Sequence, residues 1–247
     1  MARRTPDGPP PPPVVQRLRV RFAKRGRLRF TSHRDFARAF ERALRRAEVP
    51  MAYSAGFSPH PKISYVGAAP TGVASEAEYL EIGLARECDP EAVGAALDAA
   101  LPDGLDIVEV LPAGPGSLAE RMQASHWRIE LPGVSVGEAG DALRALHAEE
   151  SVPVERLTKD GRRIIDVRPA ILAVALKPGE RAIMDLVVRQ VTPAVRPDDI
   201  LAALRIVAGL APAAPPVVVR LAQGPIDENG AVSDPLAPDR ATARTSP

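Results

Sequence analysis

The sequence predicts an α+β protein made of two ferredoxin-like halves, each with the element order β-α-β-β-α-β and an antiparallel sheet. Three observations lead to this prediction: strictly alternating strand patterns, helices with one apolar stripe, and a recurrence of the element order along the chain. Residues 17–112 form the first predicted half and residues 117–223 the second, with a junction at 112–116.

The first predicted element is a strand with a basic outer face. Residues 17–22 alternate between arginine and apolar side chains, which is typical of a strand with one buried face. Residues 24–27 predict a turn after it. Leu28 and Phe30 continue the alternation, which favours a hairpin or a bulged extension of the same strand.

A helix follows, with apolar residues on one face and arginines on the other. Ser32 is a good N-cap because Asp35 follows three residues later, and the pair Val49-Pro50 ends the helix. One buried stripe is predicted from the spacing of Phe36, Ala39, Phe40, Ala43, Leu44 and Ala47. The opposite face carries Arg34, Arg38, Arg42, Arg45 and Arg46.

Shorter patterns predict the remaining elements of both halves. The first half is completed by strands at 62–66, 78–84 and 105–111 and a helix at 90–101. The order strand, helix, strand over 79–110 recurs over 183–221, where Pro197 and Leu204 repeat Pro90 and Leu97 at the same separation of 107 residues. The missing strand, helix and strand are expected at 126–131, 136–147 and 163–176.

Both ends of the chain are predicted to be disordered. Residues 1–16 contain an uninterrupted proline run, and residues 224–247 are rich in small, polar and proline residues without periodicity. The sequence has no apolar run near the roughly 20 residues that span a bilayer, and its N-terminus lacks the apolar stretch of a signal peptide. We therefore expect a cytoplasmic protein without membrane contact.

The positive charge of the chain is concentrated in one segment. Residues 17–62 contain 13 Lys or Arg and only 3 acidic residues, a net charge of +10, whereas the whole chain carries +1. Aromatic and histidine side chains lie in the same segment. This combination indicates a polyanion partner, most often a nucleic acid.

The sequence gives no reason to expect a cofactor or a metal. Cys88 is the only cysteine, which excludes an internal disulfide and an iron–sulfur cluster of the chain's own, since a cluster takes three or four thiolates. Glu76, Glu78 and Glu81 are better explained as salt-bridge partners of the basic segment than as metal ligands.

The densest group of candidate site residues after the basic segment is the loop 53–62. One glycine and two prolines forbid a helix and fix an ordered loop. Tyr53, Phe57 and His60 give this loop surfaces that could stack on a base.

Residues 18–79 also carry a series of motifs in a fixed order. The motifs are Arg21-Phe22-x-Lys24-x-Gly26-x-Leu28-x-Phe30-x-Ser32-His33-x-Asp35, Arg45-Arg46-Ala47, Tyr53-Ser54-x-Gly56-Phe57-x-Pro59-His60-Pro61-Lys62-Ile63-Ser64 and Gly72-x-x-Ser75-x-x-Glu78-Tyr79. The series resembles the radical-SAM-associated protein family of unknown function. Members of that family occur alone or fused behind a cobalamin-binding radical SAM protein. The resemblance is dense over 17–112 and loose over 120–222.

The resemblance implies a biochemical context and no established activity. Stand-alone members tend to be encoded near the radical SAM enzyme and near genes for ribonuclease E/G-type and ribosomal proteins. Because this chain lacks the three-cysteine cluster motif, the radical chemistry must reside in a separate chain. The resemblance therefore implies a non-catalytic accessory protein that presents RNA, either tRNA or rRNA, for modification or processing.

RNA binding is the leading hypothesis, because the charge pattern and the resemblance both lead to it. The residues expected to neutralise phosphates are Arg19, Arg21, Lys24, Arg27, Arg34, Arg38, Arg42 and Lys62. Tyr53, Phe57 and His60 are expected to shape the site, where stacking contributes about 1–3 kcal/mol per base.

Two other hypotheses stay open. In the first, the chain is a metal-independent RNA endonuclease or transferase in which His33 or His60 is a general base for attack by a ribose 2′-hydroxyl. In the second, the chain is a protein-docking subunit without RNA affinity, whose basic face binds an acidic partner.

Overall fold

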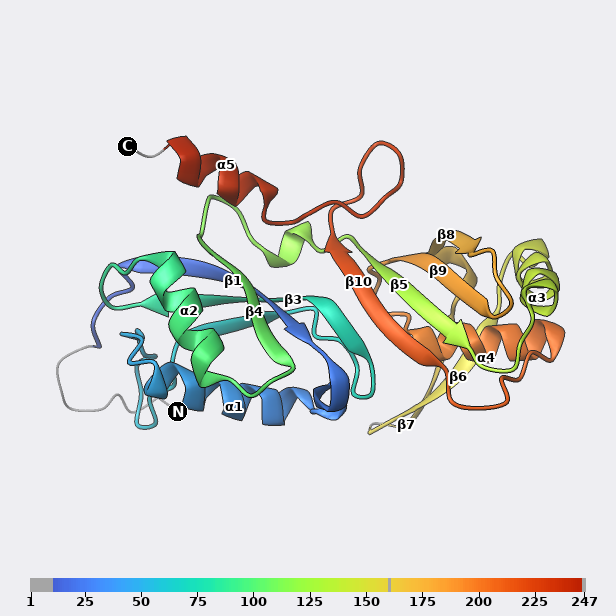
Figure 1. The fold of residues 1–247 in the computed structure, drawn as a ribbon, viewed down its shortest axis with the longest axis horizontal. Helices are drawn as coiled ribbons and strands as arrows, with labels where there is room; N and C mark the ends of the chain where they lie inside the picture. Colours follow the sequence, from blue (N-terminus) through green and yellow to red (C-terminus); the bar gives the residue numbers. More distant parts are fainter. Residues whose placement is uncertain (1–10, 160, 246–247) are drawn as a thin grey trace, which may run out of the picture. The chain divides into compact units, whose positions relative to one another are not determined.

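The computed structural model describes residues 11–159 and 161–245. It is a mixed α+β structure with five α-helices in these residues, and most of its strand pairs are antiparallel (Figure 1). The described chain divides into two compact units. The first consists of residues 11–71, Glu76–Glu120 and 236–245, and the second of Gly72–Ser75 and Arg121–Pro235.

The first unit contains a four-stranded sheet and three helices. Its elements are β1 (Gln16–Lys24), α1 (His33–Arg46), β2 (Ile63–Val66), β3 (Ala74–Leu84), α2 (Pro90–Ala100), β4 (Leu105–Pro112) and α5 (Ala237–Thr245). The strand order is β4-β1-β3-β2, and the pairs β4–β1 and β2–β3 are antiparallel. The predicted order of strands and helices over 17–112 is therefore present.

Helices α1 and α2 cover the same face of this sheet. Leu18 and Val20 of β1 are fully buried, and they belong to one cluster with Phe36 of α1 and Leu97 of α2. The rings of Phe22 and Phe36 stack with their centroids 4.4 Å apart. The alternating pattern of β1 thus identified the buried face correctly.

The segment after β1 differs from the sequence prediction. Gly26–Phe30 forms a 3₁₀ helix, where a hairpin or an extension of β1 was expected. Gly26 adopts a positive φ of 53°, a conformation that ends the strand at no steric cost. Because Leu28 and Phe30 are only two residues apart, their spacing did not distinguish a strand from a short tight helix.

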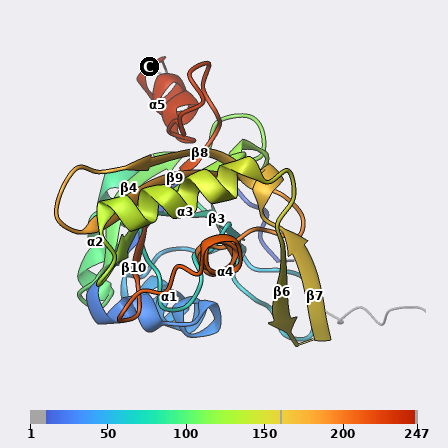
Figure 2. The same ribbon diagram turned by 90° about the vertical axis from the view of Figure 1, so that its right-hand side faces the viewer.

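The second unit contains four strands of the larger sheet, two helices and a separate hairpin. Its elements are β5 (Ala124–Leu131), α3 (Val136–Ala148), β6 (Pro153–Thr158), β7 (Gly161–Asp166), β8 (Ile171–Leu176), β9 (Ala182–Arg189), α4 (Pro197–Ala208) and β10 (Val217–Gly224). The order β10-β5-β9-β8 is antiparallel throughout. Ala74 and Ser75 pair with β10 in parallel. Helices α3 and α4 pack together and cross each other (Figure 2).

The single strand predicted over 163–176 is wrong. The structure places the end of β7 there, then a 3₁₀ turn at Arg168–Ala170, and then β8. Pro169 breaks the strand because it has no backbone N–H and its ring fixes φ. Strands β6 and β7 pair only with each other, so they form a hairpin outside the larger sheet.

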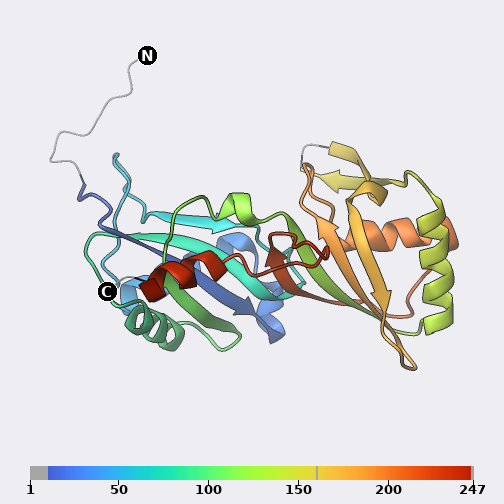
Figure 3. The ribbon, with the colours of Figure 1, turned by 90° about the horizontal axis from the view of Figure 1, so that it is seen from above.

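The C-terminal residues also differ from the prediction of a disordered tail. Helix α5 lies beside β4 in the first unit (Figure 3), and Leu236 and Asp239 are fully buried. Composition alone predicted disorder, whereas these two buried side chains hold the segment in place. Most of the predicted leader, residues 1–16, lies outside the described residues.

Candidate nucleic-acid interface

Helix α1 presents a row of exposed arginines. Arg34, Arg38 and Arg42 follow each other at intervals of one helical turn, and all three are exposed. Ser32 caps the helix, because its hydroxyl oxygen accepts a hydrogen bond from the Asp35 N–H at 3.2 Å. The cap sets where the helix begins, and the buried stripe on the opposite face turns the arginines toward solvent, as the sequence predicted.

Three arginines of this helix have no acidic partner in the part of the chain that the structure describes. They are Arg34, Arg42 and Arg45. Arg38 lies 3.9 Å from Asp35, and Arg46 donates a hydrogen bond to the Ala100 carbonyl at 3.3 Å. Exposed arginines that form no ion pair are free to bind a polyanion.

The arginines of β1, in contrast, do not form an open basic face. Arg17 and Arg19 both pair with Glu81, at 3.0 and 3.2 Å. Arg19 is 1% exposed and also pairs with Asp239 of α5 at 2.6 Å. Arg21 is half-buried and donates to the Glu76 carbonyl at 3.1 Å. The predicted phosphate contact of Arg19 is therefore corrected, because its guanidinium is enclosed.

Lys24 is the second predicted phosphate contact that the structure encloses. Its side chain is 5% exposed, and its ammonium donates to the Pro70 carbonyl at 3.2 Å and lies 3.4 Å from the Ala69 carbonyl. Arg27 and Lys62, in contrast, are exposed. The open basic surface therefore centres on α1 and no longer includes the middle of β1.

Two glutamates of β3, Glu76 and Glu81, form salt bridges with the basic segment, as the sequence predicted. Glu76 pairs with Arg25, and Glu81 pairs with Arg17 and Arg19. Glu78 is buried and accepts a hydrogen bond from the Ala69 N–H at 3.1 Å. Glu81 thus pairs with two of the three arginines on β1.

The loop 53–62 is ordered and closed on itself. Tyr53 and Pro61 form an isolated bridge, the Ser54 N–H donates to the His60 carbonyl at 2.9 Å, and the His60 N–H donates to the Ser54 hydroxyl at 3.1 Å. His60 thus holds the loop through its backbone, while its ring is exposed. Phe57 is 73% exposed and Tyr53 is 39% exposed, so both rings are open to a stacking partner.

His33 lies at the beginning of α1, beside a small cavity. Its ring meets Tyr65 of β2 edge to face, with the centroids 4.9 Å apart. The cavity has a volume of about 20 Å³, room for about one water molecule and too little for a base. It is lined by His33 and Tyr65 together with Lys24, Glu78 and Tyr79. His33 contacts Tyr65, whereas His60 bonds to Ser54 within the loop 53–62, so the two candidate histidines do not form one site.

The Tyr65 hydroxyl is the unusual group of this cavity. It is buried and has no hydrogen-bond partner among residues 11–159 and 161–245. Burial raises the pKa of the phenol well above its ordinary value, and the nearby Glu41 carboxylate raises it further. The packing of Tyr65 against His33 and Phe36 was not visible in a pattern of four strand residues.

Sequence reasoning missed the partners that enclose Arg19. Asp239 lies 220 residues away along the chain, and the Gly116 carbonyl, which also accepts a hydrogen bond from Arg19, is 97 residues away. A signal for α5 did exist, because Pro238 and Asp239 stand at its beginning and Arg244 near its end. The low apolar content of the segment concealed it.

Neither a metal cluster nor a membrane span is found in the described residues. They hold no group of three or more His, Cys, Asp or Glu side chains placed to bind a metal ion. None of the described helices is long and apolar enough to cross a membrane.

The fold and the site together define an α+β protein with an arginine-bearing helix exposed beside an aromatic loop. The chain belongs to a bacterial family described as "uncharacterized protein conserved in bacteria (DUF2344)", whose model matches residues 17–197. No curated protein matches the chain.

One solved structure with a partial likeness is the crystal structure of a Cbf5–Nop10–Gar1 complex. The matched chain of that complex is 11% identical, with a TM-score of 0.48, and the match covers 92% of this chain and 56% of that one. This chain therefore spans little more than half the length of its structural neighbour. The likeness is too weak to carry an inference about function.

Proposed function

We propose that this protein is a non-catalytic RNA-binding accessory protein, and that α1 and the loop 53–62 form its contact surface. The single observation that carries the proposal is the set Arg34, Arg42 and Arg45, exposed arginines without a carboxylate partner in the described chain. Arg34 and Arg42 are separated by about 12 Å along the helix axis, at 1.5 Å per residue. The row can therefore follow a phosphate backbone.

The aromatic loop supports single-stranded RNA as the ligand. The loop follows α1 along the chain, and its Phe57 and Tyr53 rings are exposed. Arginines bind phosphates without regard to sequence, and exposed rings stack on unpaired bases. Arg27, Arg38, His60 and Lys62 remain in the proposed surface, because their side chains are exposed.

The proposal includes a separate radical SAM enzyme as the partner, with tRNA or rRNA modification or processing as the context. This part rests on the resemblance of the motifs in residues 18–79 to the radical-SAM-associated family. The accessory protein would hold the RNA, and the partner chain would supply the radical chemistry.

We also propose that both units are ferredoxin-like and arose by duplication. The strand order β4-β1-β3-β2 in the first unit corresponds to β10-β5-β9-β8 in the second. Helices α2 and α4 both begin with a proline, Pro90 and Pro197. Along the chain, α2 lies between β3 and β4, and α4 lies between β9 and β10, which hold the same positions in the two strand orders. The hairpin β6–β7 is then an insertion into the second unit.

A salt titration with matched variants tests RNA binding. We expect the affinity for fluorescently labelled single-stranded RNA to fall steeply with salt for the wild type. The variant with Arg34→Gln, Arg42→Gln and Arg45→Gln should have a slope of log K against log salt that is shallower by about 2, since each lost phosphate contact removes about 0.7.

The control carries the same loss of charge elsewhere. Arg86→Gln, Arg189→Gln and Arg205→Gln replace three exposed arginines outside the proposed surface. The control should keep the wild-type slope. A flat slope in the wild type, or an equal change in both triple variants, would contradict the proposal.

A second candidate function, RNA cleavage or transfer at His33, is favoured by one observation. The His33 ring lies against Tyr65 beside the small cavity that Lys24 and Glu78 also line. A histidine in this position can act as a general base. Pure protein should then cleave RNA in the presence of EDTA, and His33→Ala should abolish cleavage while His60→Ala keeps it. An intact RNA pool after incubation with the wild type would rule this function out.

A further inference from the structure

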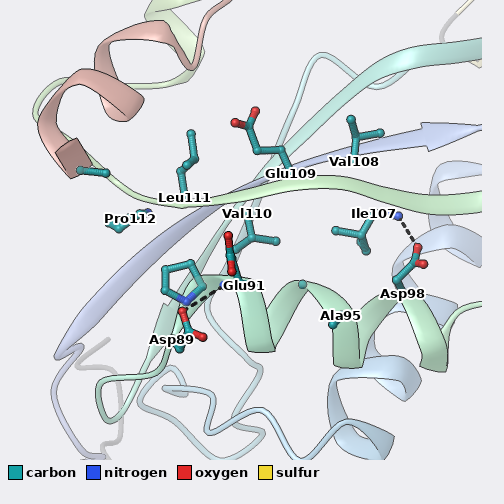
Figure 4. Close-up of a pocket in the computed structure, with 13 residues that line it drawn as sticks. Asp89, Glu91, Ala95, Asp98, Ile107, Val108, Glu109, Val110, Leu111 and Pro112 are labelled. Atoms are coloured by element: carbon teal, nitrogen blue, oxygen red, sulfur yellow. Dashed lines mark hydrogen bonds between the residues drawn. The ribbon is translucent and has the colours of Figure 1, made fainter.

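A second, chemically different hollow lies in the first unit, along strand β4. Its volume is about 650 Å³, within the range of about 300–1,000 Å³ typical of ligand sites. The wall contains six consecutive residues of β4, from 107 to 112, and faces α2 on one side (Figure 4). Ala243 of α5 contributes to the other side.

The consecutive lining residues locate this hollow relative to the strand. Successive side chains of a strand point to opposite faces of the sheet. A hollow on one face would therefore contact every second residue, whereas this one contacts all six. It must lie along the outer edge of β4, where an additional strand would be placed.

The outer edge of β4 has no strand partner in the described chain. β4 is the terminal strand of the order β4-β1-β3-β2. One of its edge groups is already occupied, since the Ile107 N–H donates to the Asp98 carboxylate at 2.7 Å. At Val108, which is 44% exposed, the pairing with β1 shifts register. At the other end of the strand, Pro112 has no N–H to donate. The stretch open for pairing is therefore short, residues 108–111.

The hollow is acidic. Four carboxylates line it, Asp89, Glu91, Asp98 and Glu109, and none of its described lining residues is Lys, Arg or His. Three of them already have partners: Asp89 caps α2, Asp98 holds Ile107, and Glu109 pairs with Arg240. Glu91 is exposed, and its carboxylate has no hydrogen bond or ion pair in the described chain, so its charge is open to a ligand.

We propose that this hollow binds an extended basic segment of a partner protein, which adds as a strand to the edge of β4. Edge pairing would supply backbone hydrogen bonds, and the alternating side chains would supply selectivity. Side chains directed toward α2 would be Arg or Lys, opposite Glu91. Side chains directed toward Leu111 and Ala243 would be apolar. The inference goes beyond RNA binding, since it concerns a different surface and a ligand of opposite charge.

A peptide titration tests the charge selectivity. The probe is a fluorescent hexapeptide with blocked ends in which arginine alternates with valine, and the comparison peptide has glutamate in place of arginine. Full-length protein should bind the first and not the second in fluorescence anisotropy. Glu91→Lys should weaken binding by about tenfold, because it places a like charge at the site. The matched control Glu87→Lys, which changes an exposed residue outside the lining, should not.

A second measurement separates strand addition from simple charge attraction. The arginine–valine peptide with alternate amides N-methylated keeps its charge but loses half of its backbone donors, and it should no longer bind. The unmodified peptide should slow hydrogen exchange of the amides in 109–111. Equal binding of the methylated peptide, equal weakening by Glu87→Lys, or no binding of the arginine peptide would each overturn the proposal. Displacement of a protein dimer by the peptide would also overturn it, because the occupant would then be a second copy of this chain.

Discussion

Individual arginines of the basic segment differ in what surrounds them, although their sequence pattern is the same. Arg19 is enclosed by two carboxylates and a carbonyl, whereas Arg34 is exposed and forms no ion pair in the described residues. A buried guanidinium that is fully paired stabilises the fold only if its partners stay in place. An exposed one adds little to stability and is available for binding. Charge counting alone does not separate these two roles.

His126 of β5 gives a residue-scale prediction about pH. Burial lowers the pKa of its imidazole, although the Asp185 carboxylate acts in the opposite direction; Arg128 and Lys177 lower the pKa further. In the unfolded chain the ring has an ordinary pKa of about 6.5. As the pH falls through that value, the unfolded state takes up a proton that the folded state binds less readily. The free energy of unfolding should therefore decrease between pH 7 and pH 5.

Urea unfolding of His126→Gln across this pH range checks the prediction. The variant should lose less stability on acidification than the wild type, because it has no ring to protonate at this position. His60→Gln, which removes an exposed ring, should behave as the wild type. An unchanged pH dependence in His126→Gln would show that other groups cause the acid sensitivity.

At the scale of elements, the local signals of the sequence identified most helices and strands. Helix α1 has its cap at Ser32 and its stripe within the helix that follows, and α2 has Asp89 as the cap and Pro90 at the first turn. These signals act between neighbours in the chain, so a sequence contains them directly. The exposed row of α1 and the closed loop 53–62 were predicted for the same reason.

The elements that sequence reasoning missed depend on contacts between distant residues. The hairpin β6–β7 was hidden because its strands pair only with each other and are followed by a 3₁₀ turn before β8. Helix α5 has few apolar residues and is held by Asp239 and Arg240, which pair with Arg19 and Glu109. Lys24 was predicted to be exposed because nothing near it in the sequence indicates the carbonyls of Ala69 and Pro70.

At the scale of the whole molecule, the first unit is completed by the C-terminal residues 236–245. Residues 236–245 belong to it, although 115 residues of the second unit, Arg121–Pro235, separate them from the rest. Leu236 is fully buried there, and Asp239 completes the ion pairs of Arg19. The stability of the first unit should therefore depend on residues that composition alone assigned to a tail.

Truncation after Pro235 tests this dependence, because it removes the C-terminal part of the first unit and leaves the second unit intact. Amides of β1 and β4 should then exchange faster with solvent, since Arg19 keeps Glu81 but loses Asp239 and the apolar contact of Leu236 disappears. Amides of β5 and β9 should stay protected. Asp239→Ala in the full chain should reproduce part of the effect, with a loss of about 3–5 kcal/mol for a broken buried ion pair. Equal loss of protection in both units, or none in either, would contradict the assignment of α5 to the first unit.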